Sequence, residues 1–263
     1  MTAGLAVERA DGVLRITLDR PRKRNAIDDD MVAGLIDEVV AAGSDESVRA
    51  ILLTGAGEHF CSGADIVARN AAGDGGRPRV GSIQRRLPWQ AHRLIPVLLE
   101  CQTPVVCAVR GWAAGIGLSL ALAADVTLAT EDATFWAPYT ARGFTPDGGI
   151  SWLLPRRIGE VRARRMLLLG ERVPGATAAE WGLIDRAVAD LDAETAAVVD
   201  ALATAPTVAV GLAKSLLHTG RGTTLENHLR DEALAMELSS RSEDFREGLA
   251  AFTEKRPPTF TGR

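Results

Sequence analysis

The sequence has little of what membrane proteins and nucleic-acid-binding proteins need. Its most apolar stretch runs only from residue 112 to residue 124 and contains Gly115 and Gly117, well short of the about 20 apolar residues that a membrane-spanning helix requires. The 30 basic and 34 acidic side chains give a formal net charge of -4, so no large field of one sign attracts nucleic acid or an anionic membrane. We therefore expect a protein that binds neither.

Cysteine is also scarce. The three cysteines, Cys61, Cys101 and Cys107, are an odd number without a CxxC pair, which is typical of reduced thiols in a reducing compartment. Glu8 and Arg9 stand where a secretory signal has its apolar segment, which argues against export. We expect a cytoplasmic protein whose cysteines fill the core.

The residue patterns of metal sites and serine hydrolases are missing as well. The four histidines, at positions 59, 92, 218 and 228, have no mutual metal-ligand spacing, so we expect no bound metal. No GxSxG segment occurs, which argues against a serine hydrolase.

Hydrophobic patterning predicts an α/β fold. Residues 5–18 alternate apolar and polar on either side of Asp11-Gly12, which favours a hairpin of two antiparallel strands. A stripe of helical period follows Asp28, the candidate N-cap, and Gly43 is the predicted stop of this helix. The chain therefore opens with two strands and an amphipathic helix.

Three short, nearly continuous apolar runs follow, at residues 50–54, 105–109 and 126–129. Such runs are typical of strands covered on both faces, and the helical patterns between them supply the crossovers of a parallel sheet. Residues 69–81 hold four glycines and no apolar periodicity, which predicts a long loop. After Ser151 the pattern is mainly helical, interrupted by a short strand at residues 184–188.

Two glycine-rich segments directly follow predicted strands: GAGEHFCSGADI at residues 55–66 and GWAAGIGLSL at residues 111–120. In the first, Phe60 replaces the third glycine of a dinucleotide-binding GxGxxG, which leaves a plain strand-exit loop as an alternative. The second opens a helix whose unpaired N–H groups favour an anion, although small residues there are also typical of close helix packing. Together, two such turns can supply the two convergent donors of an oxyanion hole.

Four segments in this order resemble the crotonase, or enoyl-CoA hydratase/isomerase, superfamily. They are Arg20-Pro21 to Asn25-Ala26, GAGEHFCSGADI, PVVCAVRGWAAGIGLSLALAAD, and Pro146-Asp147-Gly148-Gly149, and the closing EKRPPTF resembles the tail of that family. The resemblance spans essentially the whole chain. It implies an α/β spiral of repeated ββα units with an acyl-CoA site in residues 1–200, and a helical C-terminal trimerisation segment in residues 201–263.

The resemblance also implies roles for individual residues. The thioester oxygen would be held by the backbone N–H groups of Ala64 and Ile116, where Ile116 replaces a common glycine but keeps its N–H. The two glutamates that activate water in the hydratases would fall on Ser119 and Tyr139, and neither is a carboxylate that could act as a base near neutral pH. Asp147 would be the acid/base of the family's isomerases, with a Pro-Asp-Gly turn residue as the alternative.

The substrate implied by the resemblance is an acyl-CoA thioester, with no cofactor besides the coenzyme A that it carries. We predict an enoyl-CoA isomerase that uses Asp147; the alternatives are an enoyl-CoA hydratase and an acyl-CoA-binding protein of low turnover. We expect a homotrimer or a dimer of trimers. The residues implied in substrate binding are Arg24, Ala26, Gly63, Asp65, Ile66, Gly115 and Lys255, although Arg24 lies in a basic loop that could simply be solvated.

Overall fold

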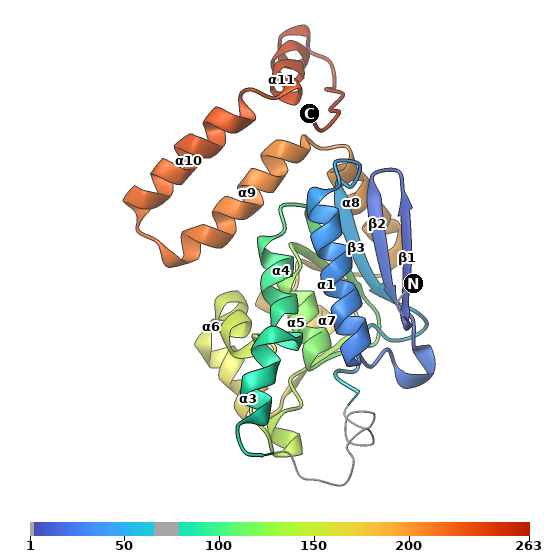
Figure 1. The fold of residues 1–263 in the computed structure, drawn as a ribbon. Helices are drawn as coiled ribbons and strands as arrows, with labels where there is room; N and C mark the ends of the chain where they lie inside the picture. Colours follow the sequence, from blue (N-terminus) through green and yellow to red (C-terminus); the bar gives the residue numbers. More distant parts are fainter. Residues whose placement is uncertain (1–2, 66–78) are drawn as a thin grey trace.

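A computed structural model describes residues 3–65 and 79–263 of the chain. Ile66 and most of the loop expected at residues 69–81 lie outside these residues. The described chain forms an α/β body with a helical C-terminal arm (Figure 1). This agrees with the fold class that the sequence predicted.

The main sheet has six strands in the order β1-β2-β3-β4-β6-β9. The predicted hairpin is confirmed, since β1 and β2 pair antiparallel, and every later neighbour pairs parallel. The three apolar runs are β3, β4 and β6, as expected. The strands are β1 (Leu5–Ala10), β2 (Val13–Leu18), β3 (Ala50–Gly55), β4 (Val105–Val109), β6 (Val126–Thr130) and β9 (Arg186–Val188).

A second sheet gives the chain its spiral. It contains β5 (Trp112–Ala114), β7 (Thr134–Trp136) and β8 (Arg172–Pro174). The chain passes from β4 of the main sheet to β5 of the second sheet and then into helix α5, and it repeats the move through β6, β7 and helix α6. These are two successive ββα turns. The sequence analysis predicted neither the second sheet nor β8.

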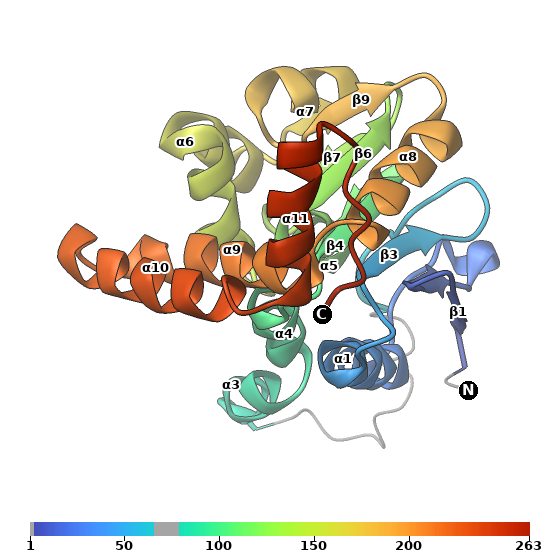
Figure 2. The same cartoon turned by 90° about the horizontal axis from the view of Figure 1, so that it is seen from above.

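Helices cover both faces of the main sheet (Figure 2). On one face, α1 (Asp29–Ser44), α4 (Leu94–Glu100) and α5 (Ile116–Ala123) pack over the larger apolar cluster. On the other face, α8 (Leu191–Ala203) packs on a smaller cluster that includes Leu52 and Val106. Alternate residues of one strand serve the two faces, which explains why the apolar runs are continuous.

The first helix begins as predicted and ends slightly later. The side chain of Asp28 caps it by accepting a 3.0 Å hydrogen bond from the N–H of Met31. Gly43, the predicted stop, lies inside α1, which continues to Ser44. A Cβ atom at Gly43 would lie 3.5 Å from the sulfur of Cys101, an ordinary contact, and a glycine with helical dihedrals does not by itself end a helix.

The remaining helices complete the body and the arm. The helices of the body are α3 (Ser82–Arg86), α6 (Ile150–Leu168) and α7 (Gly175–Trp181). The arm contains α9 (Thr207–Thr219), α10 (Leu225–Ser239) and α11 (Glu243–Glu254). Short 3-10 turns are η1 (Pro21–Lys23), η2 (Leu87–Trp89), η3 (Ala91–Arg93), η4 (Thr140–Arg142) and η5 (Gly220–Gly222). Within the described residues, no single helix meets the length and hydropathy of a membrane span; α8 and α9 do so only as a pair bent by 105°.

The last residues of the chain are tied back to α11. Asp244 is 2% exposed, and its carboxylate accepts hydrogen bonds from the N–H groups of Thr261 at 2.7 Å and Gly262 at 2.9 Å. Glu247 accepts two hydrogen bonds from Arg256, and this partner lowers the pKa of Glu247 to about 2. The tail is therefore an ordered part of the arm.

Replacing Asp244 with alanine should release this tail. The change leaves two backbone N–H groups without their acceptor, which costs about 1–3 kcal/mol of unfolding free energy when such groups stay buried. Carboxypeptidase digestion followed by mass measurement should remove the last residues faster than in the parent. Asp231→Ala, at an exposed position of α10, is the control, and equal digestion rates for the two variants would contradict the expectation.

Candidate active site

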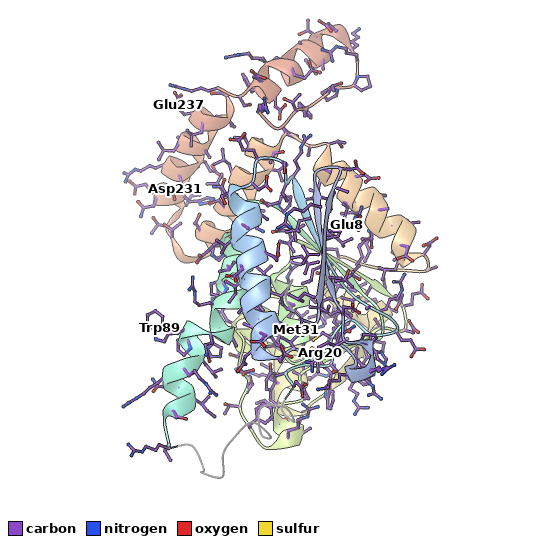
Figure 3. The ribbon with its side chains drawn as sticks, turned by 45° about the vertical axis from the view of Figure 1, so that its right-hand side comes forward. Glu8, Arg20, Met31, Trp89, Asp231 and Glu237 are labelled. Atoms are coloured by element: carbon purple, nitrogen blue, oxygen red, sulfur yellow. The ribbon has the colours of Figure 1, made fainter. Side chains whose placement is uncertain are left out.

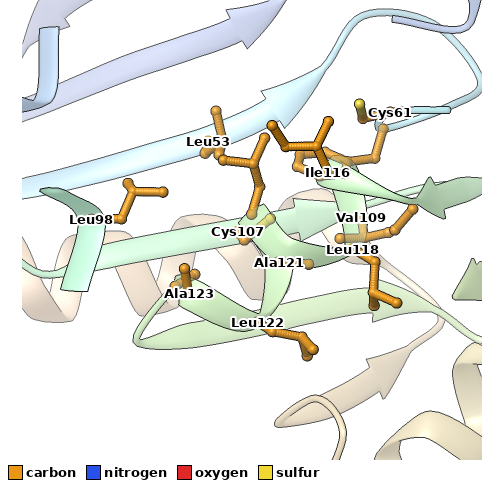
Figure 4. Packing of buried hydrophobic residues seen from close by; sticks show 14 of the residues in the cluster. Leu53, Cys61, Leu98, Cys107, Val109, Ile116, Leu118, Ala121, Leu122 and Ala123 are labelled. Atoms are coloured by element: carbon orange, nitrogen blue, oxygen red, sulfur yellow. The ribbon is translucent and has the colours of Figure 1, made fainter. Parts of the chain in front are cut away.

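The two glycine-rich segments lie against one another. A ladder of backbone hydrogen bonds joins them, from the N–H of Cys61 to the carbonyl of Trp112 at 2.8 Å and from the N–H of Ala114 to the carbonyl of Cys61 at 2.9 Å. Figure 4 shows Cys61 beside Ile116 at the end of the core. Segments that lie some 50 residues apart in the sequence therefore meet at one point.

Glycine makes this close approach possible. Gly63 has a φ of 112° and Gly115 a φ of 56°, a region that other residues rarely adopt. A Cβ atom at Gly117 would lie 2.7 Å from both the Cβ and the carbonyl oxygen of Cys61. Any side chain there would push α5 away from the first segment.

The backbone N–H of Ala64 points away from the ladder that holds its neighbours. Ala64 forms an isolated parallel bridge with Ile27, in which the carbonyl of Gly63 accepts from Ile27 at 2.9 Å and the N–H of Asp65 donates to Ile27 at 2.8 Å. In a parallel pair, successive residues bond alternately to the two sides. The N–H of Ala64 therefore faces the opposite side and donates no hydrogen bond to the described backbone.

The backbone N–H of Ile116 is unpaired for a different reason. Ile116 is the first residue of α5, and the first N–H groups of a helix have no intrahelical acceptor. The preceding N–H, of Gly115, donates to the carbonyl of Trp136 at 3.1 Å. The positive end of the helix dipole adds to the attraction of this N–H for an anion.

Both of these residues line one cavity of about 90 Å³. Asp147 lines the same cavity, so it is part of the candidate site and also belongs to a turn. Most of the lining is apolar or glycine, and the polar groups are few. The lining consists of Gly63, Ala64, Ala91, His92, Gly115, Ile116, Pro138, Tyr139, Arg142, Phe144, Asp147 and Gly148.

The turn that carries Asp147 leads into α6. Gly148 has a φ of 59° and Gly149 a φ of 78°, and the carbonyl of Asp147 accepts from the N–H of Ile150 at 3.3 Å. The sequence offered two alternative roles for Asp147, an acid/base and a turn residue. In the structure, the Pro-Asp-Gly turn itself lines the cavity, so the two roles do not exclude one another. The Asp147 residue is exposed as well as lining the cavity.

Tyr139 lies behind this turn. It is 3% exposed, its ring packs edge-on against Phe144 with centroids 5.5 Å apart, and its hydroxyl donates to the carbonyl oxygen of Asp147 at 3.3 Å. Burial raises the pKa of the Tyr139 hydroxyl, and the nearby charge of Asp147 raises it further. Tyr139 therefore stays protonated and acts as a donor throughout the neutral range.

Ser119 lies deeper than Tyr139. It is fully buried on α5, and it lies close enough to the Tyr139 hydroxyl to lower the pKa of Tyr139 slightly. Its Oγ has no hydrogen bond of standard geometry within the described part of the chain. Both positions that would hold the hydratase glutamates are thus buried and carry no carboxylate.

A second, more open cavity of about 640 Å³ adjoins the first. The two share Ala64 and Arg142 in their linings, so they meet beside the N–H of Ala64. Three of the predicted binding residues, Arg24, Ala26 and Asp65, also line this outer cavity. The full lining is Lys23, Arg24, Ala26, Ser62, Ala64, Asp65 and Arg142.

The carboxylate of Asp65 is held by the protein itself. It forms ion pairs with Arg20 and Lys23, each at 2.9 Å, and Arg20 also pairs with Asp28 at 2.9 Å. Figure 3 shows Arg20 close to Met31 at the start of α1. The side chain of Asp65 thus fixes the basic loop beside the outer cavity.

The geometry of the site agrees with the similarity of this chain to known proteins. The profile of the family described as enoyl-CoA hydratase/isomerase matches residues 8–263. The chain belongs to this family. Like the family as a whole, it is an enzyme that acts on CoA thioesters.

Relatives named as isomerases and relatives named as hydratases are both similar to this chain along nearly their whole length. The 1,2-epoxyphenylacetyl-CoA isomerase of Escherichia coli is 39% identical over 254 residues, covering 96% of each chain. The 2,3-dehydroadipyl-CoA hydratase of the same organism is 33% identical, covering 98% of this chain and 99% of its own. The crystal structure of an enoyl-CoA hydratase from Mycobacterium smegmatis has a TM-score of 0.89 at 30% identity and covers 98% of each chain.

Within this enoyl-CoA hydratase/isomerase family member, the structure gathers most of the predicted site residues. Gly63, Ala64, Gly115, Ile116 and Asp147 line the inner cavity. Ile66 lies outside the described residues. Lys255 ends α11 in the arm, lines neither cavity, and its role in substrate binding stays a prediction.

The sequence analysis missed several residues of the inner cavity. His92 comes from η3, and its Nε2 is buried without a hydrogen-bond partner in the described chain. Arg142 and Phe144 lie within the segment between Tyr139 and Asp147. No spacing marks His92, whereas the other two could have been found from their place in that segment.

The thiols of Cys61 and Cys107 are packed in the core. Burial raises the pKa of Cys61 to about 12 and raises that of Cys107 further, so both stay thiols at neutral pH. No group of three or more His, Cys, Asp or Glu side chains that could hold a metal occurs in residues 3–65 and 79–263.

Replacing Gly117 with alanine should open the site. The added Cβ meets the Cβ and the carbonyl oxygen of Cys61, and such overpacking costs about 1–3 kcal/mol of unfolding free energy. Acyl-CoA binding, measured by titration calorimetry, should weaken because the two N–H groups move apart.

The matched control is Gly43→Ala, whose Cβ has room in α1 and which should stabilise the helix by up to about 1 kcal/mol. Parental stability and binding in Gly117→Ala would show that the close contact does not set the geometry of the site.

Proposed function

We propose that this enzyme is an enoyl-CoA isomerase that moves the double bond of a 3-enoyl-CoA into conjugation with the thioester. The observation that carries the proposal is the inner cavity, which Ala64, Ile116 and Asp147 all line; within the described residues, the backbone N–H groups of Ala64 and Ile116 donate no hydrogen bond. The proposed reaction needs no cofactor besides the coenzyme A of the substrate.

The two N–H groups would bind the thioester oxygen. Removal of a proton from the carbon next to a thioester places negative charge on that oxygen. Donors fixed at Ala64 and Ile116 stabilise this charge without having to reorganise, and a single such donor typically contributes about 10²–10³ in rate. The outer cavity, with Lys23, Arg24 and Arg142 in its lining, would receive the anionic coenzyme A.

A single carboxylate is sufficient for the proton transfers. Asp147 would take a proton from the α carbon of the 3-enoyl group, which leaves a dienolate, and would return the same proton to the γ carbon. The product is the 2-enoyl-CoA, and Asp147 ends as the carboxylate with which it began. The apolar lining supports this role because water that entered would compete for the proton.

Two alternatives remain as proposals of lower rank. Enoyl-CoA hydratase is supported by relatives of that name, but Ser119 and Tyr139 do not supply the carboxylates that activate water. An acyl-CoA-binding protein of low turnover would keep the oxyanion hole and lose the chemistry. The Escherichia coli relative named as an isomerase acts on an epoxide of a CoA thioester, so the leading proposal is favoured by the residues of the inner cavity and not by that name.

Asp147→Asn should lose most isomerase turnover and keep acyl-CoA binding. The amide is nearly isosteric but cannot accept the α proton, and acid/base groups contribute typically about 10²–10⁴-fold. The measurement is conversion of 3-enoyl-CoA followed by chromatography, with binding of a saturated acyl-CoA measured in parallel. Parental turnover in the Asn variant would remove Asp147 from the mechanism.

Incubation of the parent protein with a 2-enoyl-CoA tests the hydratase alternative. A hydratase product gains the mass of one water, whereas an isomerase product keeps the mass of its substrate. Rapid water addition together with no conversion of 3-enoyl-CoA would establish the hydratase instead.

We also propose that the arm assembles the chain into a homotrimer or a dimer of trimers. Leu225, Leu229 and Met236 recur on one face of α10 and are 72%, 53% and 59% exposed, and exposed apolar patches of this kind typically mark an interface. Figure 3 labels Asp231 and Glu237 on the same helix, which projects from the α/β body.

Leu229→Asp should therefore shift the assembly toward single chains, because a carboxylate in an apolar interface is costly to desolvate. Light scattering at micromolar concentration should give three or six chains for the parent and fewer for the variant. Asp231→Asn on the same helix is the control. A single-chain mass for the parent would contradict the proposal.

A further inference from the structure

The carbonyl oxygen of Asp147 ties its turn to neighbouring elements, because it accepts from the N–H of Ile150 at 3.3 Å and from the Tyr139 hydroxyl at 3.3 Å. Asp147 is followed by Gly148 and Gly149, and glycine has more conformational freedom to lose than any other residue. The Tyr139 hydroxyl donates to the Asp147 carbonyl oxygen from a side chain that is 3% exposed. This bond ties the backbone of Asp147 itself, rather than a neighbour, to the core.

The orientation of the Tyr139 hydroxyl is also fixed. Its ring is held edge-on against Phe144, at an interplanar angle of 87°, and the fully buried Ser119 lies on its inner side. A Cβ atom at Gly148 would lie 3.4 Å from Ser119 Oγ, so the turn, Ser119 and Tyr139 are in one packed group. Ser119 Oγ forms no hydrogen bond of standard geometry in the described chain, so its part in this group is one of packing.

We propose that Tyr139 is a positioning residue that holds Asp147 at the acyl cavity, with the buried Ser119 packed in the same group. This inference rests on the proposed function, in which Asp147 moves the proton. It gives the residues at the two positions of the hydratase glutamates a role of their own. In this chain they support the acid/base group from behind, and they do not act on water.

The chemistry of the two side chains suits this role. A protonated phenol is a donor without charge, so it can lie beside the Asp147 carboxylate without repelling it. Burial and the charge of Asp147 both keep the Tyr139 proton in place by raising the pKa of Tyr139. A carboxylate in the same position would repel Asp147 and could not donate to its carbonyl oxygen near neutral pH.

Tyr139→Phe tests the inference because the ring and its packing against Phe144 remain. We expect kcat for 3-enoyl-CoA to fall about 10-fold, the order of one lost hydrogen bond that matters in the transition state, with KM within about twofold. Hydrogen exchange of the peptide that covers residues 144–150, read by mass spectrometry, should become faster. Ser119→Ala should change both quantities in the same direction and by less.

Three outcomes would overturn the inference. Unchanged kcat in Tyr139→Phe shows that Asp147 needs no such support. A rise in KM that matches the fall in kcat shows that Tyr139 contacts the substrate directly. Parental hydrogen exchange at residues 144–150 shows that the bond does not hold the turn.

Failure of the proposed function gives a different result. In that case the parent converts no 3-enoyl-CoA, or Asp147→Asn keeps the parental rate, while the hydrogen-exchange comparison still reports whether Tyr139 holds the turn. Circular dichroism of each variant confirms that it is folded.

Discussion

The close contact between the segment around Cys61 and the start of α5 is the constraint on which the site depends. Gly117 permits the contact because no side chain separates the two backbones, and Gly63 and Gly115 adopt the positive φ values that turn the chain on either side. The parallel bridge at Ala64 and the helix start at Ile116 then leave one N–H each unpaired. Two donors thus face one cavity as a result of backbone geometry, independent of any side chain.

Much of this arrangement could be predicted from sequence, and the limits have physical causes. Strands β4 and β6 were predicted from the apolar runs at residues 105–109 and 126–129, because strands covered on both faces have no polar alternation to confuse the pattern. The strand Arg172–Pro174 was not predicted, because three residues are too few to show a period. Ala64, Ile116 and Asp147 came from a family resemblance, whereas His92 depends on how η3 folds over the cavity, which no local pattern encodes.

The charged side chains around the outer cavity have different roles. Asp65 is engaged by Arg20 and Lys23, so its carboxylate organises the loop, while Arg24 and Arg142 also line the space. A buried carboxylate without partners would be costly, and two cations offset that cost. The same two ion pairs hold the loop against the segment that carries Ala64, which couples the shape of the outer cavity to the position of one oxyanion donor.

The number of ionisable groups near the cavity also matters for the chemistry. Carboxylates at positions 119 and 139 together with Asp147 would place several like charges in one buried region, and repulsion would favour the protonated form of at least one of them. Ser119 and Tyr139 avoid this repulsion and leave Asp147 as the sole carboxylate among the residues that line the inner cavity. A single base beside two fixed N–H donors can move a proton between two carbons of a thioester substrate, but it offers no second carboxylate to orient an attacking water. Under the proposed function, the absence of carboxylates at positions 119 and 139 therefore favours proton transfer over the addition of water.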